Sequence, residues 1–211
     1  MSRSTRWSLI TAVALGDDRA QSAFVSAYRP TVLRYVERQG VGAAAEDVTQ
    51  DVFVRLMVKG GLERVVRGTS FRAYLFTVTR NALLDHLRRA GAERRGGNAE
   101  IVPLLEQEPS VDERESFDRE WLLNLLEVSL ARLEREHPSY YVAVKGFVWD
   151  ERPQAELAAE AGCSVQDVRN HVHRGRKKLA AYIKEEIARY ERDPGRFATE
   201  VEAVSRLLQG A

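Results

Sequence analysis

The chain has 211 residues, of which 44% are hydrophobic and 30% are charged, as is usual for a globular protein with one large domain or two small ones. No apolar run approaches the roughly 18–20 residues of a membrane span, and Asp17 and Asp18 come too early for a secretory signal. We therefore expect a cytoplasmic protein without membrane contact. The single cysteine, Cys163, excludes an internal disulfide and a cysteine-rich zinc site and predicts a half-buried thiol.

The formal net charge of +1 averages over unlike blocks of sequence. Residues 100–120 are dominated by Glu and Asp, whereas residues 86–95 and 166–178 are dominated by Arg and Lys. This asymmetry indicates specific surfaces that face a polyanion, joined by a segment that would avoid one.

Apolar residues recur at intervals of three and four, and alternating β-branched runs are nearly absent, so an all-α fold is predicted. The first predicted helix covers 19–39, with Pro30 marking a new first turn and Gly40 ending the element. A second helix covers 43–61, with its acidic side chains opposite an apolar side. A third covers 70–91 and ends at Gly91.

Residues 92–119 lose the periodicity and gain Gly, Pro, Glu and Ser, which is typical of a linker. Helical periodicity resumes at Trp121, and Asp193 to Gly195 break the chain again. A last amphipathic segment carries an apolar seam of Phe197, Val201, Val204 and Leu208, which we expect to dock on a domain or on a regulator. The predicted architecture is thus two small helical domains joined by an acidic linker, plus a short C-terminal helical extension.

The stretch VQDVRNHVHRGRKKL, residues 165–179, has a basic face and an apolar seam when placed on a helix. The seam consists of Val165, Val168, Val172, Gly175 and Leu179, and the opposite face of Gln166, Asn170, His173, Arg174 and Lys177. A short helix, a turn at Gly162 and a cap at Ser164 precede it, as in a helix-turn-helix. Gln, Asn and Arg match base edges and Lys suits phosphates. A solvated basic helix is the alternative, but the combined features favour DNA binding.

The segment FRAYLFTVTRNALLDHLRR, residues 71–89, is also basic and aromatic. We expect Phe71 and Tyr74 in the core, and its charged side chains fit a nucleic-acid surface and a solvated face equally well. His171 and His173 point about 200° apart on a helix, which excludes a metal site built on this pair. No catalytic motif or phosphate loop occurs in the sequence, so neither an enzyme nor a cofactor is expected.

The order AEDVTQDVFVRL, FRAYLFTVTRNALLDHLRR, acidic linker and SVQDVRNHVHRGRKKL resembles the extracytoplasmic-function (ECF) sigma factors of bacterial RNA polymerase, from about Asp17 to Ile183. The resemblance implies a region 2-like domain over 1–92, which binds the β′ clamp helices of core polymerase and opens the −10 element. It implies a linker over 93–119 that passes through the polymerase cleft and a region 4-like domain over 120–190 that reads the −35 element beside the β flap. The extension over 191–211 exceeds the family pattern.

The resemblance also implies the residues of each site. Core polymerase would be bound by Glu46, Asp47, Gln50, Asp51 and Arg55. The −10 element would be bound by Arg80, Asn81, Asp85, Arg88 and Arg89. The −35 element would be read by Gln166, Arg169, Asn170, Arg174 and Lys177.

Two positions depart from the family pattern. Ala44 stands where an acidic residue is usual, and Gly175 replaces an Ala, which costs about 1 kcal/mol of helix propensity unless close packing requires it. An anti-sigma factor or a Ser/Thr kinase are regulators compatible with the resemblance, and Thr49 in the acidic tract is the phosphorylation site expected for such a kinase. The alternative functions are a stand-alone helix-turn-helix repressor or activator, and a helical scaffold with a basic face.

Overall fold

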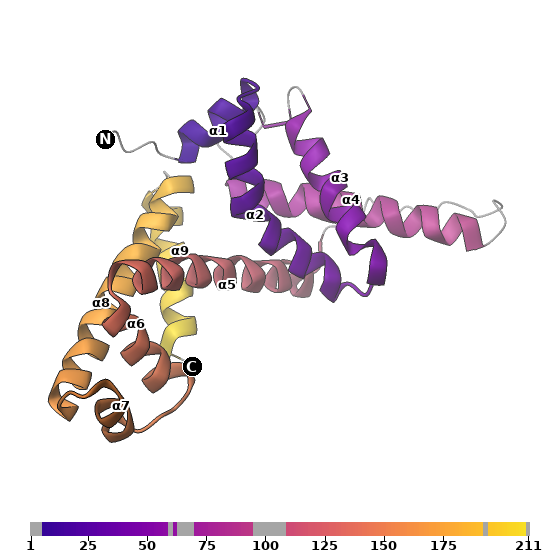
Figure 1. The fold of residues 1–211 in the computed structure, drawn as a ribbon. Coiled ribbons are helices and arrows are strands. Elements are labelled where there is room, and N and C mark those ends of the chain that lie inside the picture. Colours follow the sequence, from indigo (N-terminus) through magenta and orange to yellow (C-terminus); the bar gives the residue numbers. More distant parts are fainter. Residues whose placement is uncertain (1–5, 59–60, 63–69, 95–108, 192–193, 210–211) are drawn as a thin grey trace. The chain divides into compact units, whose positions relative to one another are not determined.

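The computed structural model describes residues 6–58, 61–62, 70–94, 109–191 and 194–209. Within these ranges all regular structure is helical, so the all-α prediction is confirmed. The chain divides into two compact units, Met1–Trp121 and Leu122–Ala211, whose helices are labelled in Figure 1. Among the described helices, none combines the length and the apolar character that a membrane span requires.

The first unit is a set of helices that pack in chain order. It contains α1 (Arg6–Ala14), α2 (Asp18–Arg38), the short 3-10 turn η1 (Gly42–Ala44), α3 (Ala45–Met57), α4 (Phe71–Arg94) and the beginning of α5 (Val111–Glu136). Helix α1 packs on α2, α2 on α3, and α3 on α4. The α1 helix was not anticipated from the sequence.

An aromatic core holds the first unit together. Phe71 of α4 contacts both Tyr28 of α2 and Trp121 of α5, with ring centroids 4.7 Å and 6.2 Å away, and these two rings stack on each other. Phe117 of α5 lies 5.3 Å from the ring of Tyr35, and both side chains have no exposed surface. The beginning of α5 therefore belongs to this core.

The predicted linker is wrong over residues 111–119, because α5 begins at Val111. Its first turn is a capping box: the Glu113 amide donates to Ser110 Oγ (3.1 Å) and the Ser110 amide donates to the Glu113 carboxylate (2.8 Å). The sequence Ser-x-x-Glu carries this signal. The acidic composition of the segment outweighed it in the sequence analysis.

Two predicted breaks in the helices are also wrong. Pro30 lies inside α2, and Gly91 lies inside α4. A proline in a helix costs about 3 kcal/mol, but α2 has buried residues on both sides of it, including Phe24 before and Tyr35 after. Packing of these side chains against one core keeps both halves of the helix in register.

The second unit comprises the rest of α5, α6 (Pro138–Val144), a π-helical segment η4 (Lys145–Trp149), α7 (Gln154–Ala161), α8 (Val165–Tyr190) and α9 (Pro194–Gln209). Helix α8 packs against α6, α7 and α9. A compact apolar cluster joins α6, α7 and α8. Its buried members are Ala143, Leu157, Ala158, Val168 and Val172, with Phe147 and Cys163 packed against it.

Gly175 is required by close packing between α8 and α6. A Cβ atom at this position would lie 2.5 Å from Val144 Cγ2 and 3.1 Å from the Tyr140 carbonyl oxygen. Both distances are shorter than ordinary van der Waals contact. The departure from the family pattern at Gly175 thus has a local explanation.

The C-terminal helix α9 docks on α8 within the second unit. Val204 of the predicted seam is 4% exposed, and Phe197 and Val201 are half-buried. The side chain of Leu208 lies outside the described residues. The prediction that this segment packs onto a domain is confirmed.

Candidate nucleic-acid and protein interfaces

The outward face of α3 is acidic, as its amphipathic sequence predicts. Glu46, Asp47 and Gln50 are exposed, whereas Val48 and Val52 on the opposite side are buried. Glu46 accepts a hydrogen bond from the guanidinium of Arg29 in α2, a contact that the sequence analysis missed. Asp47 makes no ion pair with a described residue, so its negative charge is open to a binding partner.

Ala44 is the N-cap residue of α3 and supplies no side-chain cap. Glu46 and Asp47 lie in the first turn, where their charges interact favourably with the positive end of the helix dipole. Although position 44 carries an alanine in place of the usual acidic residue, the first turn of α3 is therefore still acidic.

Thr49 does not face solvent. It lies on the buried side of α3 and is 1% exposed. A kinase must reach the hydroxyl, so the expectation that this residue is phosphorylated by a Ser/Thr kinase is wrong for the folded protein. The helical register decides this, because Thr49 follows Val48 on the core-facing side.

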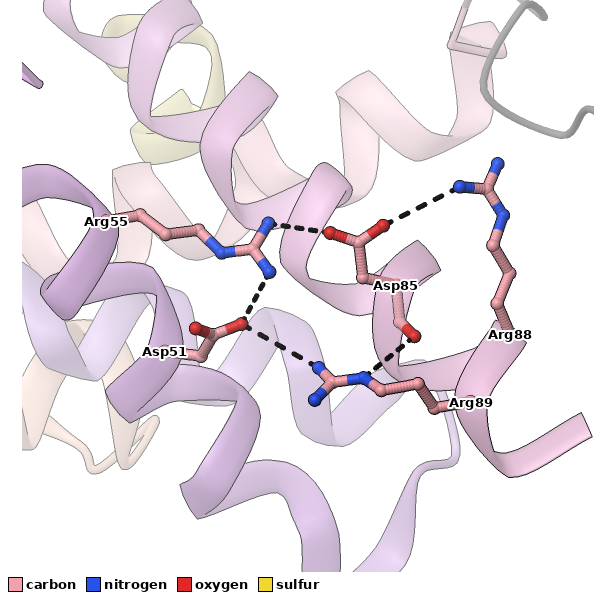
Figure 2. Close-up of polar contacts among 5 residues, drawn as sticks. All are labelled: Asp51, Arg55, Asp85, Arg88 and Arg89. Carbon is pink, nitrogen blue, oxygen red and sulfur yellow. Dashed lines mark hydrogen bonds and ion pairs between the residues drawn. The ribbon is translucent and has the colours of Figure 1, made fainter. Parts of the chain in front are cut away.

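Figure 2 shows that Arg55 of α3 joins the two helices of the candidate site. Its Nη2 donates to Asp51 Oδ2 at 2.7 Å within α3, and its Nη1 donates to Asp85 Oδ2 of α4 at 2.9 Å. Burial lowers the pKa of Arg55, but these hydrogen bonds and the two negative charges outweigh it, so the pKa is raised above its usual value.

The same two carboxylates hold the basic end of α4. Arg88 Nη1 lies 3.6 Å from Asp85 Oδ1, and Arg89 Nη2 lies 4.0 Å from Asp51 Oδ2. Arg89 Nε also donates to the main-chain oxygen of Asp85 at 3.2 Å (Figure 2). Residues expected in two different sites therefore form one ion network, which we call the α3–α4 network: Asp51, Arg55, Asp85, Arg88 and Arg89.

Arg80, expected to contact the −10 element, is 8% exposed. Its Nε lies 3.3 Å from Glu113 Oε1, which the capping box of α5 holds in place. Burial and then the charge of Glu113 raise the pKa of the neighbouring Tyr35 to about 12. Asn81 is half-buried. The Arg80 side chain is therefore buried in an ion pair within the first unit, whereas the Arg89 side chain is exposed to solvent.

The start of α8 has the geometry of a helix-turn-helix. Gly162 ends α7 with φ +62°, a left-handed conformation that favours glycine. Ser164 then caps α8 in a capping box with Asp167. Hydrogen bonds from Ser164 lower the pKa of Asp167, which also places a negative charge at the positive end of the helix.

The outward face of α8 presents the residues expected to read the −35 element. Gln166, Arg169, Asn170, Arg174 and Lys177 are all exposed, and so is His173. On the opposite side Val168, Val172, Gly175 and Leu179 are buried, and Val165 is 37% exposed. The predicted division of the helix into a polar face and an apolar seam is confirmed, except at its first residue.

Three of the exposed side chains take part in hydrogen bonds. Arg169 Nε donates to Gln154 Oε1 at 3.0 Å, and Gln166 Nε2 donates to Asn170 Oδ1 at 3.3 Å. Gln154 lies at the start of α7 and was missed in the sequence analysis, since no local pattern relates it to a residue of the next helix. His171 points away from this face toward Tyr140, with ring centroids 5.4 Å apart.

Comparison with known proteins agrees with this geometry. Residues 24–93 match the family model described as sigma-70 region 2, which covers most of α2, α3 and almost all of α4. The first unit therefore resembles sigma-70 region 2, and the second unit contains a helix-turn-helix.

The curated relatives narrow the class. The probable RNA polymerase sigma-C factor of Mycobacterium bovis is 27% identical over 190 residues, which cover 82% of this chain and 90% of that protein. The ECF sigma factor EcfG of Rhodopseudomonas palustris is 22% identical over 150 residues, 70% of this chain and 76% of that protein. The ECF sigma factor SigE of Mycolicibacterium smegmatis is 29% identical over 139 residues, which cover 66% of this chain and 51% of that protein. Over most of its length the chain is thus similar to ECF RNA polymerase sigma factors, at modest identity.

Proposed function

We propose that the protein binds core RNA polymerase, directs it to promoters and helps to open the −10 region, without catalysing a reaction itself. The observation that carries this proposal is the pairing of a sigma-70 region 2 unit with a capped helix-turn-helix whose outward face is polar and basic. Such a protein works in the cytoplasm, where the polymerase is. We assign the region 2 function to the first unit and the region 4 function to the second unit.

The −35 element is read by the outward face of α8. Arg174 and Asn170 are exposed and have the side chains that form paired hydrogen bonds with guanine and adenine. Arg169 is held by Gln154, which reduces the conformational entropy that Arg169 loses on binding. Lys177 is exposed one turn further along the helix and suits a phosphate.

Core polymerase is bound by the outward face of α3, where Asp47 and Gln50 are exposed and Asp51 is partly exposed. An acidic face of this kind requires a basic partner surface. The clamp helices of the β′ subunit are that partner in the family, and the β flap is the expected partner of the second unit.

The −10 element is contacted by the exposed end of α4, through Arg88, Arg89 and Asn81. Arg80 contributes only if its pair with Glu113 opens, because its side chain is 9% exposed in that pair. The stand-alone repressor remains the rival function, and it predicts DNA binding that does not depend on polymerase.

Selection from a randomised DNA pool tests the proposal. The full chain is incubated with the pool in the presence and in the absence of core polymerase, and the retained DNA is sequenced. The proposal predicts two conserved elements that are recovered only with core polymerase. Recovery of a palindrome by the protein alone would support the repressor instead.

A further inference from the structure

The α3–α4 network places Arg55 in a role other than the direct polymerase contact that its position in the acidic tract suggests. Its guanidinium spans from Asp51 to Asp85, with both hydrogen bonds shorter than 3 Å. Figure 2 shows the side chain directed at α4. The positive charge of this arginine is thus already paired with two carboxylates, although three of its five N–H donors are not used in these two hydrogen bonds.

Asp85 is an acidic residue on a helix end that is otherwise basic. Its side chain is 38% exposed, and Arg88 and Arg89 follow it within one turn. An uncompensated carboxylate at this place would repel a DNA backbone. Arg55, reaching over from α3, supplies the closest positive charge to it.

The α3–α4 network carries a net positive charge, and Arg89 is its most exposed member. Three guanidinium groups face two carboxylates, so the sum is +3 − 2 = +1. Arg89 has the weakest ion pair, at 4.0 Å, and the most exposed side chain of the five, at 67%. It is therefore the member best placed to leave the network for a phosphate.

We propose that Arg55 is a positioning residue for promoter binding: it neutralises Asp85 and Asp51 and so leaves Arg89 available to the DNA backbone near the −10 element. This inference rests on the proposed sigma function. It gives Arg55 a part in promoter binding although Arg55 does not itself touch DNA. It also reassigns Arg55, because the docking of polymerase then depends on the outward acids of α3 and not on this guanidinium.

The test uses the full chain with core polymerase and a forked DNA that carries the −10 element found by selection. Arg55→Gln reduces the network charge to +2 − 2 = 0, and adding Asp85→Asn returns it to +2 − 1 = +1. Three quantities are measured: the affinity for core polymerase without DNA, the affinity of the assembled complex for the forked DNA at several salt concentrations, and the melting temperature.

We expect Arg55→Gln to leave the affinity for core polymerase undiminished and to weaken binding of the forked DNA roughly three- to tenfold at low salt, as one unscreened charge near a phosphate would. The difference should shrink as salt rises. Asp85→Asn in the same chain should restore the DNA affinity to within about twofold of the wild type. A purely structural role for Arg55 does not predict this rescue.

Arg72→Gln is the matched control. Arg72 also ties α4 to another helix, through Asp118 of α5 at 3.4 Å, but it lies thirteen residues before Asp85, about 20 Å along the helix. We expect Arg72→Gln to bind the forked DNA as the wild type does, and Arg72→Gln combined with Asp85→Asn to bind it as Asp85→Asn alone does. If Arg55→Gln does not fold, Arg55→Lys, which can reach only one carboxylate, should show a smaller loss that Asp85→Asn also repairs.

A loss of core affinity in Arg55→Gln that Asp85→Asn does not repair would overturn the inference and return Arg55 to the docking surface. Unchanged DNA affinity in Arg55→Gln would overturn it as well. Failure of the wild-type protein to bind the forked DNA with core polymerase would instead refute the proposed function, so the two failures are distinguishable.

Discussion

Replacement of Gly175 by alanine should destabilise the second unit, although alanine is the better helix former. The new Cβ atom would lie 2.5 Å from Val144 Cγ2 and 3.1 Å from the main-chain oxygen of Tyr140. Val144 is 1% exposed and β-branched, so it has little freedom to move. Overpacking a core costs about 1–3 kcal/mol, and the gain in helix propensity recovers about 1 kcal/mol. We expect a net loss of about 1 kcal/mol.

A double-mutant cycle separates the two contributions. Val144→Ala alone opens a cavity and is destabilising, but it also removes the shortest contact of a methyl group at position 175 and leaves only the longer ones with Tyr140. Gly175→Ala should then be neutral or stabilising by up to about 1 kcal/mol, which gives a coupling energy of roughly 1–2 kcal/mol between the two sites. Urea denaturation of the full chain, followed by circular dichroism, measures it. A gain in stability from Gly175→Ala in the wild-type background would refute the packing argument.

Three further predictions follow from the interfaces and from the second unit. Asp47→Arg should abolish co-purification with core polymerase while the melting temperature changes little, since exposed charges contribute about 0–1 kcal/mol to stability. Retained binding would contradict the assignment of α3. Arg174→Ala should cost roughly 1–3 kcal/mol of binding free energy, through lost discrimination at a single promoter position. Lys177→Ala should instead weaken binding to all promoters alike and reduce the salt dependence of binding. Footprints that are unchanged on the −35 side would contradict both predictions. A hydrogen bond from Tyr182 and others from arginines lower the pKa of Glu136 from 4.5 to about 2, so its contribution to stability is present above pH 4.5 and is lost as the pH falls toward 2; Glu136→Gln should flatten this part of the stability curve measured by denaturation between pH 2 and pH 6.

The beginning of α8 could be predicted from sequence because the signals that specify it are local. Gly162, Ser164 and the three- and four-residue spacing of Val168 and Val172 specify a turn, a cap and a buried side without reference to distant residues. The exposed face is then determined by helical geometry alone. The same reasoning placed Asp47 outside and, had it been applied to Thr49, would have placed that residue inside.

The pairing of Arg80 could not be predicted in this way. Its partner Glu113 is 33 residues away in sequence, beyond a segment whose composition resembles a linker. The Ser110 and Glu113 capping box is a local signal for the start of α5, but it does not say where that helix packs. The aromatic contacts of Phe117 and Trp121 with the first unit decide that.

Arg55 shows a similar limit. The resemblance to ECF sigma factors placed it among the residues that contact polymerase, and its spacing from Asp51 predicts an ion pair within the helix. The approach of α4, which brings Asp85 to the other side of the guanidinium, is a tertiary feature. Sequence periodicity therefore identified the surfaces, whereas the contacts between helices determine which charges on them are available.

Run-off transcription tests the central claim most directly. A template carrying the two elements recovered by selection is incubated with nucleotides, core RNA polymerase and the full chain, with core polymerase alone as the reference. The account predicts a transcript of defined length that requires both proteins and is reduced when Arg174 is replaced by alanine. Absence of the transcript, with core polymerase that is active with another sigma factor, would contradict it.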